Sequence, residues 1–364
     1  GQKTAVLGTV GNGFLNATSA ASNTTPDAIL LQAMLAEYLA LDAQAVVMEV
    51  SSHGLDQGRV NGLEFDVAVL TNLSRDHLDY HGNMEAYAQA KQKLFAWPSL
   101  KCAVINADDA FGVDLLAALK ANAKPVLSYG FSAESDVRGS HLRLHEAGLS
   151  MQVTYKQSSV ELQAPILGRF NAYNVLAVLS ALLAVGVSLE QALPALAQLQ
   201  SVPGRMQQCG GGKLPLVVVD YAHTPDALEK VLMTLREQAP GQLICLFGCG
   251  GERDTGKRPL MGSVAAALAD QIIVTSDNPR SESPEAIIAE VLQGMNDAVY
   301  QVQPDRAQAI KLAILSAQPG DIVLLAGKGH ERYQEVAGVK QPFDDVEQAR
   351  LALQQYRMRQ GVPA

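Results

Sequence analysis

The chain has 364 residues, of which 48% are hydrophobic and 18% charged, with a formal net charge of -9. This length indicates about two domains with their own cores, and the negative charge argues against a nucleic-acid partner. No apolar run reaches the roughly 18 residues that a membrane helix needs, and no signal peptide opens the chain, so we expect no membrane partner. The four cysteines form no C-x-x-C pair, which indicates reduced thiols and a cytoplasmic location.

The first half of the chain alternates strand and helix patterns, which predicts an α/β domain. Buried-strand patterns that end in polar loops are "AQAVVMEVSSHG", "FDVAVLTNLSRDH" and "CAVINADD". Short strands with turns are expected from about residue 125 to about 165, and "GRFNAYNVLAVLSALLAVGV" predicts a long apolar helix. The shift to a new strand series at "VPGR" predicts one domain over residues 1–202 and a second over residues 203–364.

The second half repeats a pattern of strand, loop and helix. Apolar strands that alternate with helices predict a parallel, doubly wound sheet of the Rossmann-like kind. The strands are expected to end at Asp220, Phe247, Ser276 and Ala326. Ligands bind at the carboxyl ends of the strands in such a sheet, so functional residues should gather in the loops that follow.

Capping residues mark where several helices of the second half begin. Thr224 and Ser283 each stand directly before a proline, as an N-cap stands before the first helical residue. Asp344 and Glu347 have the spacing of a capping box at the start of the last helix.

One segment resembles a phosphate-binding loop only in part. Gly251–Lys257, "GERDTGK", matches the start of a P-loop, but Arg258 follows where a P-loop has the Ser or Thr that binds Mg²⁺. We therefore do not interpret it as a nucleotide-hydrolysing loop. Its glycine amides and Arg253 still suit a carboxylate or a phosphate.

Candidate metal ligands follow two strands of the first half. Glu49 in "MEVSSHGLDQGR" ends a buried-strand pattern, where a carboxylate is costly unless it is hydrogen-bonded or binds a metal. The segment "TNLSRDHLDYHG" concentrates polar side chains after the next strand, namely Asp76, His77, Asp79 and His81. Oxygen ligands with an imidazole suit Mg²⁺ or Mn²⁺ better than zinc, but a polar turn with capping aspartates would look the same. Lys91 lies on a predicted amphipathic helix, where a surface lysine is the simpler interpretation.

The strand ends of the second half also carry polar or glycine residues. They are Asp220 and His223 in "DYAHTP", Asp277 to Arg280 in "DNPR", and Gly327, Lys328, His330 and Glu331 in "GKGHERYQ". A solvated loop arginine is the plain interpretation of Arg280, and a capping turn is that of Asp220. Capping alone does not explain polar residues at so many strand ends.

Several sequence words occur together and in one order: "NTTPDA", "MEVSSHGL", "TNLSRDHLDYHG", "AYAQAK", "GRFNAYN", "VPGRM", "DYAHTPDALEK", "GCGGERDTGKRPLMG", "DNPR" and "AGKGHERYQ". Over nearly the whole chain they resemble the Mur ligases of peptidoglycan synthesis, and most of all the members that add diaminopimelate. The resemblance implies an amide ligase that uses ATP and Mg²⁺, with a central ATP-binding domain and a Rossmann-like C-terminal domain. Its substrates would be UDP-MurNAc-L-Ala-D-Glu and meso-2,6-diaminopimelate.

The reaction of this family gives the candidate residues their roles. Converting the D-glutamate γ-carboxylate to an acyl phosphate provides a leaving group, and Mg²⁺ with cationic side chains carries the electrostatics between two polyanions. The resemblance implies that Glu49 and His77 are Mg²⁺ ligands and that Lys91 is the family's carbamylated lysine, an anion near the metal. The positions that it places on the nucleotide side are Asn171, Asn174 and Asp220.

The resemblance also assigns the two acceptor substrates. The positions that hold the muramoyl dipeptide are Asn23, Thr24, Thr25, Ser51, Gln57 and Arg59. The positions that contact the incoming amino acid are Asp277, Asn278, Pro279 and Arg280, together with Arg253, Gly327 and Glu331. Arg280 can fork onto the distal carboxylate of diaminopimelate, and Glu331 suits an ammonium. A lysine substrate would leave Arg280 without that partner.

The sequence departs from the family at its start. The family begins with a uridine-binding domain and opens its central domain with a P-loop of the form G-T-N-G-K-T, whereas this sequence begins at "GQKTAVLGTVGNG". Without the lysine and threonine of that loop the γ-phosphate of ATP has no binding site, so we expect a fragment that is inactive by itself. We also expect a monomer.

Two kinds of alternative stay open. A lysine-adding Mur ligase or a folylpolyglutamate synthase is the alternative enzyme, and "DNPR" argues against both. A binding module that keeps the amino-acid site without catalysis is the alternative from another class, and the retained Glu49, His77 and Lys91 favour an active parent.

Overall fold

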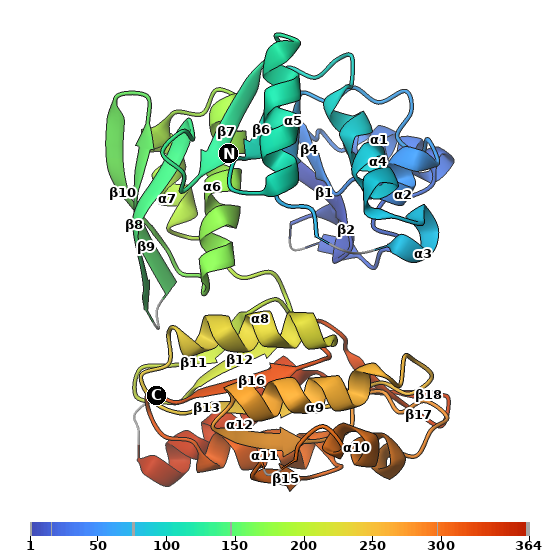
Figure 1. Cartoon of the computed structure of the whole chain (residues 1–364), viewed down its shortest axis with the longest axis vertical. Helices are drawn as coiled ribbons and strands as arrows, with labels where there is room; N and C mark the ends of the chain where they lie inside the picture. The colour runs from blue at the N-terminus through green and yellow to red at the C-terminus, as the bar shows by residue number, and fades with distance from the viewer. Residues whose placement is uncertain (1, 16, 75–76, 146–147, 297, 362–364) are drawn as a thin grey trace. The chain divides into compact units, whose positions relative to one another are not determined.

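The computed structural model describes residues 2–15, 17–74, 77–145, 148–296 and 298–361, without the side chain of Asp79. They form two compact units, which are described separately (Figure 1). The N-terminal unit comprises residues 1–141, 151–162 and 172–196, and the C-terminal unit comprises residues 142–150, 163–171 and 197–364. Because the segment between residues 142 and 171 alternates between the units, the division between residues 202 and 203 stays a prediction.

The first sheet of the N-terminal unit has the strand order β3-β2-β1-β4. Its strands are β1 (Thr4–Gly8), β2 (Gly11–Phe14), β3 (Ala17–Ser19) and β4 (Ala45–Met48). Strand β1 runs antiparallel to β2 and parallel to β4. Helix α1 (Ala28–Ala40) begins at the N-cap Asp27 and buries Leu31 and Tyr38 in one core with Leu7 of β1.

Strand β4 corrects one expectation from the sequence. Its apolar run predicts a buried strand, but the side chains of Val46 and Val47 are 39% and 63% exposed. In the described part of the chain β1 is the only strand beside β4, so β4 lies at a sheet edge. The sequence pattern shows that a strand is apolar, but its burial depends on which other elements cover it.

The second sheet of the first half has the strand order β10-β9-β8-β7-β6-β5. Its strands are β5 (Val67–Leu70), β6 (Cys102–Asn106), β7 (Val126–Gly130), β8 (Val137–His145), β9 (Gly148–Tyr155) and β10 (Ser158–Ala164). Strands β5 to β8 are parallel. The helices are α2 (Ser52–Asp56), α3 (Leu78–His81), α4 (Met84–Phe95), α5 (Ala110–Ala121), α6 (Arg169–Ala184) and α7 (Leu189–Leu196). The predicted short strands and the long apolar helix, α6, are thereby confirmed.

The C-terminal unit is built on one six-stranded sheet with the order β11-β12-β16-β13-β14-β15. Its strands are β11 (Gln207–Gly210), β12 (Leu216–Asp220), β13 (Leu243–Phe247), β14 (Gln271–Val274), β15 (Tyr300–Val302) and β16 (Ile322–Ala326). All pairs are parallel except β11 with β12. Strands of this kind, buried on both faces, are apolar at every position rather than at every second one.

Helices cover both faces of this sheet, as the doubly wound prediction requires. They are α8 (Pro225–Arg236), α9 (Lys257–Leu268), α10 (Pro284–Leu292), α11 (Arg306–Ser316) and α12 (Asp345–Gln360). Alternate residues of one strand enter different cores: Val218 packs with α8, α9 and α10, whereas Val217 and Val219 pack with α11 and α12.

The strand ends and helix caps largely follow the sequence predictions. Strands β12, β13 and β16 end where predicted, but β14 ends at Val274, two residues before Ser276. The neighbouring β15 ends at Val302, and Pro304 beyond it has no N–H group with which to continue a ladder. Thr224, Ser283 and Asp344 each accept backbone N–H groups of the first helical turn, which confirms them as N-caps.

A two-stranded hairpin, β17 (Tyr333–Val336) with β18 (Val339–Pro342), was not predicted. It is short, and its alternation is too weak to distinguish it from a loop. The backbone of Arg280 forms an isolated parallel β-bridge with Val336 of this hairpin, so the hairpin supports the "DNPR" loop. Within the described ranges, no helix combines the length and the apolar character that crossing a membrane requires.

Candidate functional site

Thr25 links three segments of the N-terminal unit. Its buried hydroxyl donates to the backbone oxygen of Glu49 at 2.9 Å and accepts the backbone N–H of Ser51 at 2.9 Å. Its own backbone oxygen accepts from the Arg59 guanidinium at 2.8 Å, and Arg59 also donates to the Gln57 side chain at 2.9 and 2.6 Å. The fold therefore brings together residues that are 34 positions apart and that were all predicted to hold the dipeptide.

The Glu49 side chain is exposed, which corrects its predicted place at the end of a buried strand. It follows the edge strand β4, so little covers it. One of its oxygens accepts from the Thr9 hydroxyl at 2.7 Å, and Thr9 pairs with the Thr24 hydroxyl at 2.9 Å. A Cβ at Gly8 would lie 2.6 Å from the other carboxylate oxygen, so glycine leaves room for the carboxylate. Asn23, beside Thr24, is exposed.

His77 and Lys91 are both close to the buried ring of Tyr87. The rings of His77 and Tyr87 have centroids 5.9 Å apart, and the Lys91 ammonium lies 4.9 Å from the Tyr87 centroid. Tyr87 and Lys91 share one face of α4 because they are four residues apart. Asp76 and the side chain of Asp79 lie outside the described residues.

His77 belongs to an aromatic cluster beside a polar hollow. The His53 ring contacts those of His77 and His81, with centroids 5.0 and 5.4 Å away, and sequence reasoning missed His53. The hollow has a volume of about 470 Å³ and is lined from α2, α3 and α4. Hydrogen bonds from Lys93 and from the Tyr80 hydroxyl lower the pKa of Asp56 in its wall. Among the side chains that the structure describes, no three His, Cys, Asp or Glu are placed to hold a metal.

Asn171 and Asn174 lie on α6, three residues apart and therefore on one helix face. Asn171 is half-buried and donates to the backbone oxygen of Leu167 at 2.7 Å, whereas Asn174 is exposed.

Asp220 is buried at the end of β12, with both carboxylate oxygens in use. They accept the backbone N–H groups of Met206 and Ala222, each at 2.8 Å. Burial nevertheless raises the pKa of Asp220. Beside it the Arg205 guanidinium lies 5.0 Å from the Tyr221 ring centroid, a cation at a strand end that sequence reasoning missed although "VPGR" was noted.

Arg280 is not the solvated loop arginine that the plain interpretation expected. Its side chain is 19% exposed, and its guanidinium donates to the backbone oxygen of Gly251 at 2.6 Å. Its Nε lies 3.8 Å from a carboxylate oxygen of Glu335 in β17. Its backbone φ of 53° is in the left-handed region, which costs energy for a residue with a Cβ. The Arg280 backbone N–H donates to the backbone oxygen of Glu335 at 3.0 Å, which holds that conformation.

The "DNPR" and "GKGHE" loops meet through buried polar side chains. The Asn278 amide nitrogen donates to Glu331 at 2.8 Å, and the Lys328 ammonium lies 3.6 Å from Asp277. A Cβ at Gly327 would lie 2.9 Å from an Asp277 oxygen, and its φ of 115° also favours glycine. The sequence placed these residues at two strand ends, and the parallel sheet brings the loops into contact. Within the "DNPR" loop, the backbone oxygen of Pro279 accepts the Glu282 N–H.

A buried ion pair between α11 and α12 supports both loops. Arg306 of α11 donates to the Asp345 carboxylate of α12 at 2.8 and 2.6 Å. The same guanidinium donates to the backbone oxygens of Ser276 and Ala326, at 3.4 and 3.0 Å. These oxygens directly precede the two loops, so one residue outside every predicted motif fixes both loop origins.

Two cationic residues of the "GERDTGK" segment differ in how the fold holds them. Arg253 is exposed, and no hydrogen bond or ion pair joins it to another residue in the described ranges. Lys257 begins α9 and donates to the backbone oxygen of His223 at 2.8 Å. This lysine is thus held by the backbone of the neighbouring loop.

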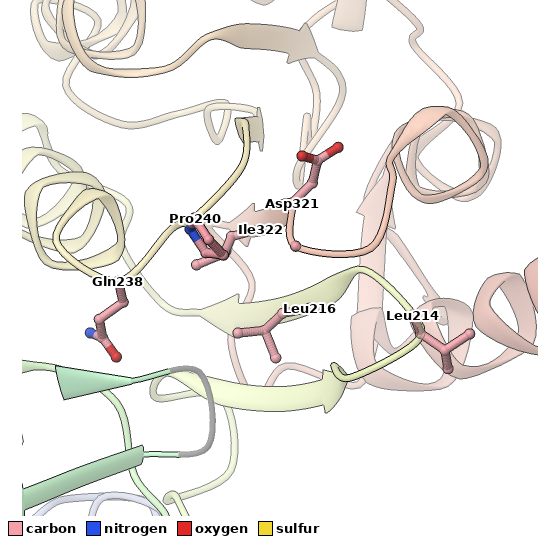
Figure 2. A pocket seen from close by; sticks show the side chains of 7 residues that line it. Leu214, Leu216, Gln238, Pro240, Asp321 and Ile322 are labelled. Carbon is pink, nitrogen blue, oxygen red and sulfur yellow. The ribbon is translucent and has the colours of Figure 1, made fainter.

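A shallow depression lies at the other end of the C-terminal sheet (Figure 2). It is lined from the first residues of β12 and β16, Leu216 and Ile322, and from Gln238, Pro240 and Asp321. None of the predicted site residues lines it, and both Asp321 oxygens accept backbone N–H groups. The carboxyl ends of the strands are therefore the better candidate site.

Fold and site together define a class of two-unit α/β proteins with charged loops at the carboxyl ends of parallel strands. The Mur ligase middle domain matches residues 1–182, and the Mur ligase glutamate ligase domain matches residues 204–329. The chain therefore belongs to the Mur ligase family.

Sequence relatives support the same assignment. The chain is 54% identical over 355 residues to the UDP-N-acetylmuramoyl-L-alanyl-D-glutamate–2,6-diaminopimelate ligase of Chromobacterium violaceum. The aligned region covers 97% of this chain and 72% of the relative. The chain is 53% identical to the ligase of the same name from Pseudomonas aeruginosa, with the same coverage.

Solved structures agree at two levels of similarity. A structure of a ligase with that name has a TM-score of 0.76 at 45% identity, over 97% of this chain and 73% of that chain. A MurF ligase from Thermotoga maritima in complex with ADP has a TM-score of 0.62 at 18% identity, over 87% and 69%, and shows the shared fold alone.

Proposed function

We propose that this protein is the ligase that joins meso-diaminopimelate to the D-glutamate γ-carboxylate of UDP-MurNAc-L-Ala-D-Glu, with ATP as the energy source. The contact between the "DNPR" and "GKGHE" loops carries the proposal. A partly buried guanidinium, Arg280, and a partly buried carboxylate, Glu331, belong to two loops that are joined by hydrogen bonds. An amino acid with both a distal carboxylate and a distal ammonium matches these two charges.

The reaction has two balanced steps. The γ-carboxylate attacks the terminal phosphorus of ATP, which forms an acyl phosphate and releases ADP. The amine of the amino acid then attacks the acyl carbon, the amide bond forms, and inorganic phosphate leaves while the amine loses a proton. The first step brings two anions together, and in the second step negative charge develops on the acyl oxygen, so cationic groups and N–H donors are needed around the reacting atoms.

The proposed metal ligands are Glu49, His77 and a carbamylated Lys91. The donor set of carboxylate oxygens with one imidazole suits Mg²⁺, and Gly8 leaves space beside the exposed Glu49 carboxylate. Bound Mg²⁺ would neutralise charge on the phosphates. A carbamate on Lys91 would supply an oxygen anion where the unmodified side chain brings a cation.

Residues on the nucleotide side follow the same proposal. Asn171 and Asn174 share one face of α6, where two amides can address a base. Asp220 holds the backbone of Met206 and Ala222, so its proposed contribution is to shape the loop as well as to contact the nucleotide. The dipeptide residues are those around Thr25: Asn23, Thr24, Thr25, Ser51, Gln57 and Arg59. The cytoplasmic location and the monomeric state stay predictions.

The test is the amino-acid dependence of phosphate release. The protein in its full natural length is assayed with ATP, Mg²⁺ and UDP-MurNAc-L-Ala-D-Glu, and meso-diaminopimelate is compared with lysine. We expect diaminopimelate-dependent phosphate release and a product whose mass corresponds to the tripeptide. Equal rates with lysine would favour a lysine-adding ligase, and diaminopimelate binding without phosphate release would favour a non-catalytic module.

Lys91→Ala tests the proposed carbamate. We expect turnover to fall by about a hundred-fold or more, because one charged metal ligand is lost, and short carboxylates added to the assay should restore part of it. Lys93→Ala is the matched control, since Lys93 is on the same helix but exposed and paired with Asp56. Near-normal activity of Lys91→Ala would show that Lys91 is a surface residue.

A further inference from the structure

Lys328 has no assigned role, yet it lies at the centre of the proposed amino-acid site. It follows Gly327 after β16, and its side chain is fully buried. Its ammonium donates to the Asn278 amide oxygen at 3.0 Å and to the Glu331 carboxylate at 3.2 Å, and it lies 3.6 Å from Asp277. All three partners belong to the loops proposed to contact the amino acid.

The cluster holds more carboxyl groups than ammonium groups. A buried ammonium is tolerated only beside anionic partners, and here two carboxylates, Asp277 and Glu331, face one resident ammonium. One oxygen of Asp277 is buried without a hydrogen-bond partner among the described residues. The local charges therefore leave room for a second ammonium, of the kind that an amino-acid substrate brings.

Lys328 also determines which way the Asn278 amide faces. The amide oxygen accepts from Lys328 and from the Glu335 backbone N–H, both at 3.0 Å. Neither donor can accept in return, so the oxygen must face them and the amide nitrogen must face Glu331. That nitrogen donates to Glu331 Oε2 at 2.8 Å, the oxygen on which Lys328 also ends.

We propose that Lys328 is a positioning residue of the amino-acid site, which orients Asn278 and Glu331 for an ammonium group of the substrate. Asn278 and Lys328 occupy Oε2 of Glu331, and no hydrogen bond reaches Oε1 from the described residues. Oε1 of Glu331 is then the acceptor for the substrate, whereas the buried oxygen of Asp277 faces the Lys328 ammonium. This role rests on the proposed function.

Lys328→Met and Lys328→Gln test the proposal in the full-length protein. Methionine fills the space without charge, whereas glutamine is neutral but can still donate to the Asn278 oxygen. We expect Lys328→Met to raise KM for diaminopimelate by roughly ten-fold or more, as loss of a charge-assisted contact does. Lys328→Gln should raise it less, and KM for ATP should change by less than about two-fold in both.

The control is Lys230→Met, which removes an exposed lysine paired with Asp226 in the same unit. It should leave every constant unchanged. A folded Lys328 variant with wild-type KM for diaminopimelate would overturn the proposal, as would equal losses for diaminopimelate and ATP. Glutamine keeps the test available if the methionine variant does not fold. Absence of diaminopimelate-dependent activity in the wild-type protein would instead reject the proposed function.

Discussion

At the scale of single residues, the candidate site depends on charged groups that the fold partly buries. Arg280 keeps a strained backbone conformation and an engaged guanidinium, and Asp277 remains buried although its oxygens are incompletely paired. Such arrangements reduce stability, and they are common where a ligand completes the interactions. Substitutions at these residues should therefore separate substrate use from stability.

Arg280→Lys tests recognition of the distal carboxylate. Lysine keeps the charge but loses the planar fork, so we expect kcat/KM for diaminopimelate to fall about ten-fold or more. Use of lysine as a substrate, poor already, should change little. The control Arg236→Lys alters an exposed arginine paired with Asp270 and should have no effect. Equal losses for both amino acids would mean that Arg280 supports the loop without reading the carboxylate.

Asp277→Asn tests the stability cost of a buried carboxyl. Burial raises the pKa of Asp277, although the nearby Arg306 and Lys328 oppose the shift. A raised folded-state pKa means that folding favours the protonated form, so the stability contribution is present below the unfolded pKa and is lost as pH rises through the folded pKa. The asparagine variant does not ionise at this position, so its stability should lack this pH-dependent loss.

The difference in thermal midpoint between the variant and the wild type should therefore move in favour of the variant as the pH rises from about 3, below the unfolded pKa of aspartate, to about 7. Exposed Asp226→Asn should show no such difference. A difference that is independent of pH would contradict the assignment. We also expect the Asp277→Asn variant to use diaminopimelate poorly, because a carboxylate beside Lys328 in the proposed amino-acid site is lost.

At the scale of elements, two helices on one face of the C-terminal sheet hold the loops that follow strands β14 and β16. Helix α11 supplies Arg306 and α12 supplies Asp345, and this pair fixes the carbonyls that precede both loops. Helix α12 itself begins at Asp345, directly after its N-cap Asp344. The start of one helix thus contributes to the geometry of a site built from strand ends.

Asp344→Ala tests this helix start. Its carboxylate accepts the N–H groups of Val346 and Glu347 at 2.8 and 3.2 Å, and loss of such a cap costs about 1 kcal/mol. Amide exchange in peptides from α12 should become roughly five-fold faster. Asp344→Ser, which keeps a capping oxygen, should behave nearly like the wild type. Unchanged exchange in Asp344→Ala would show that tertiary packing alone fixes the start of α12.

At the scale of the whole molecule, each unit has its own hydrophobic core. The C-terminal sheet is covered on both faces, and nearly all residues of those two cores lie beyond residue 203. Leu167 is the exception, because it joins the core of α8 and α9 from the segment before. The predicted domain division is therefore testable by excision.

A polypeptide of residues 203–364 should fold alone and unfold in one cooperative thermal transition, because it retains both covered faces of the sheet. Extending it to begin at residue 163, which restores Leu167, should raise the midpoint modestly. Circular dichroism during heating measures both. A non-cooperative loss of structure in the shorter polypeptide would place the division before Leu167.

Short-range features of this protein were readable from the sequence. The N-caps at Thr224, Ser283 and Asp344 and the strand ends at Asp220 and Ala326 depend on a few neighbouring residues, so local pattern predicts them. The motifs that indicate the family are local words of the same kind.

The contacts between loops were decided only by the tertiary structure. Sheet order places only β13 between β16 and β14, and this order, which no local pattern encodes, lets Lys328 after β16 reach Asn278 after β14, 50 residues away in the sequence. The exposure of β4 is another example, because an apolar strand is buried only where other elements cover it. Side-chain pairing across such distances follows from topology, and the free energy of burial then selects which charges meet.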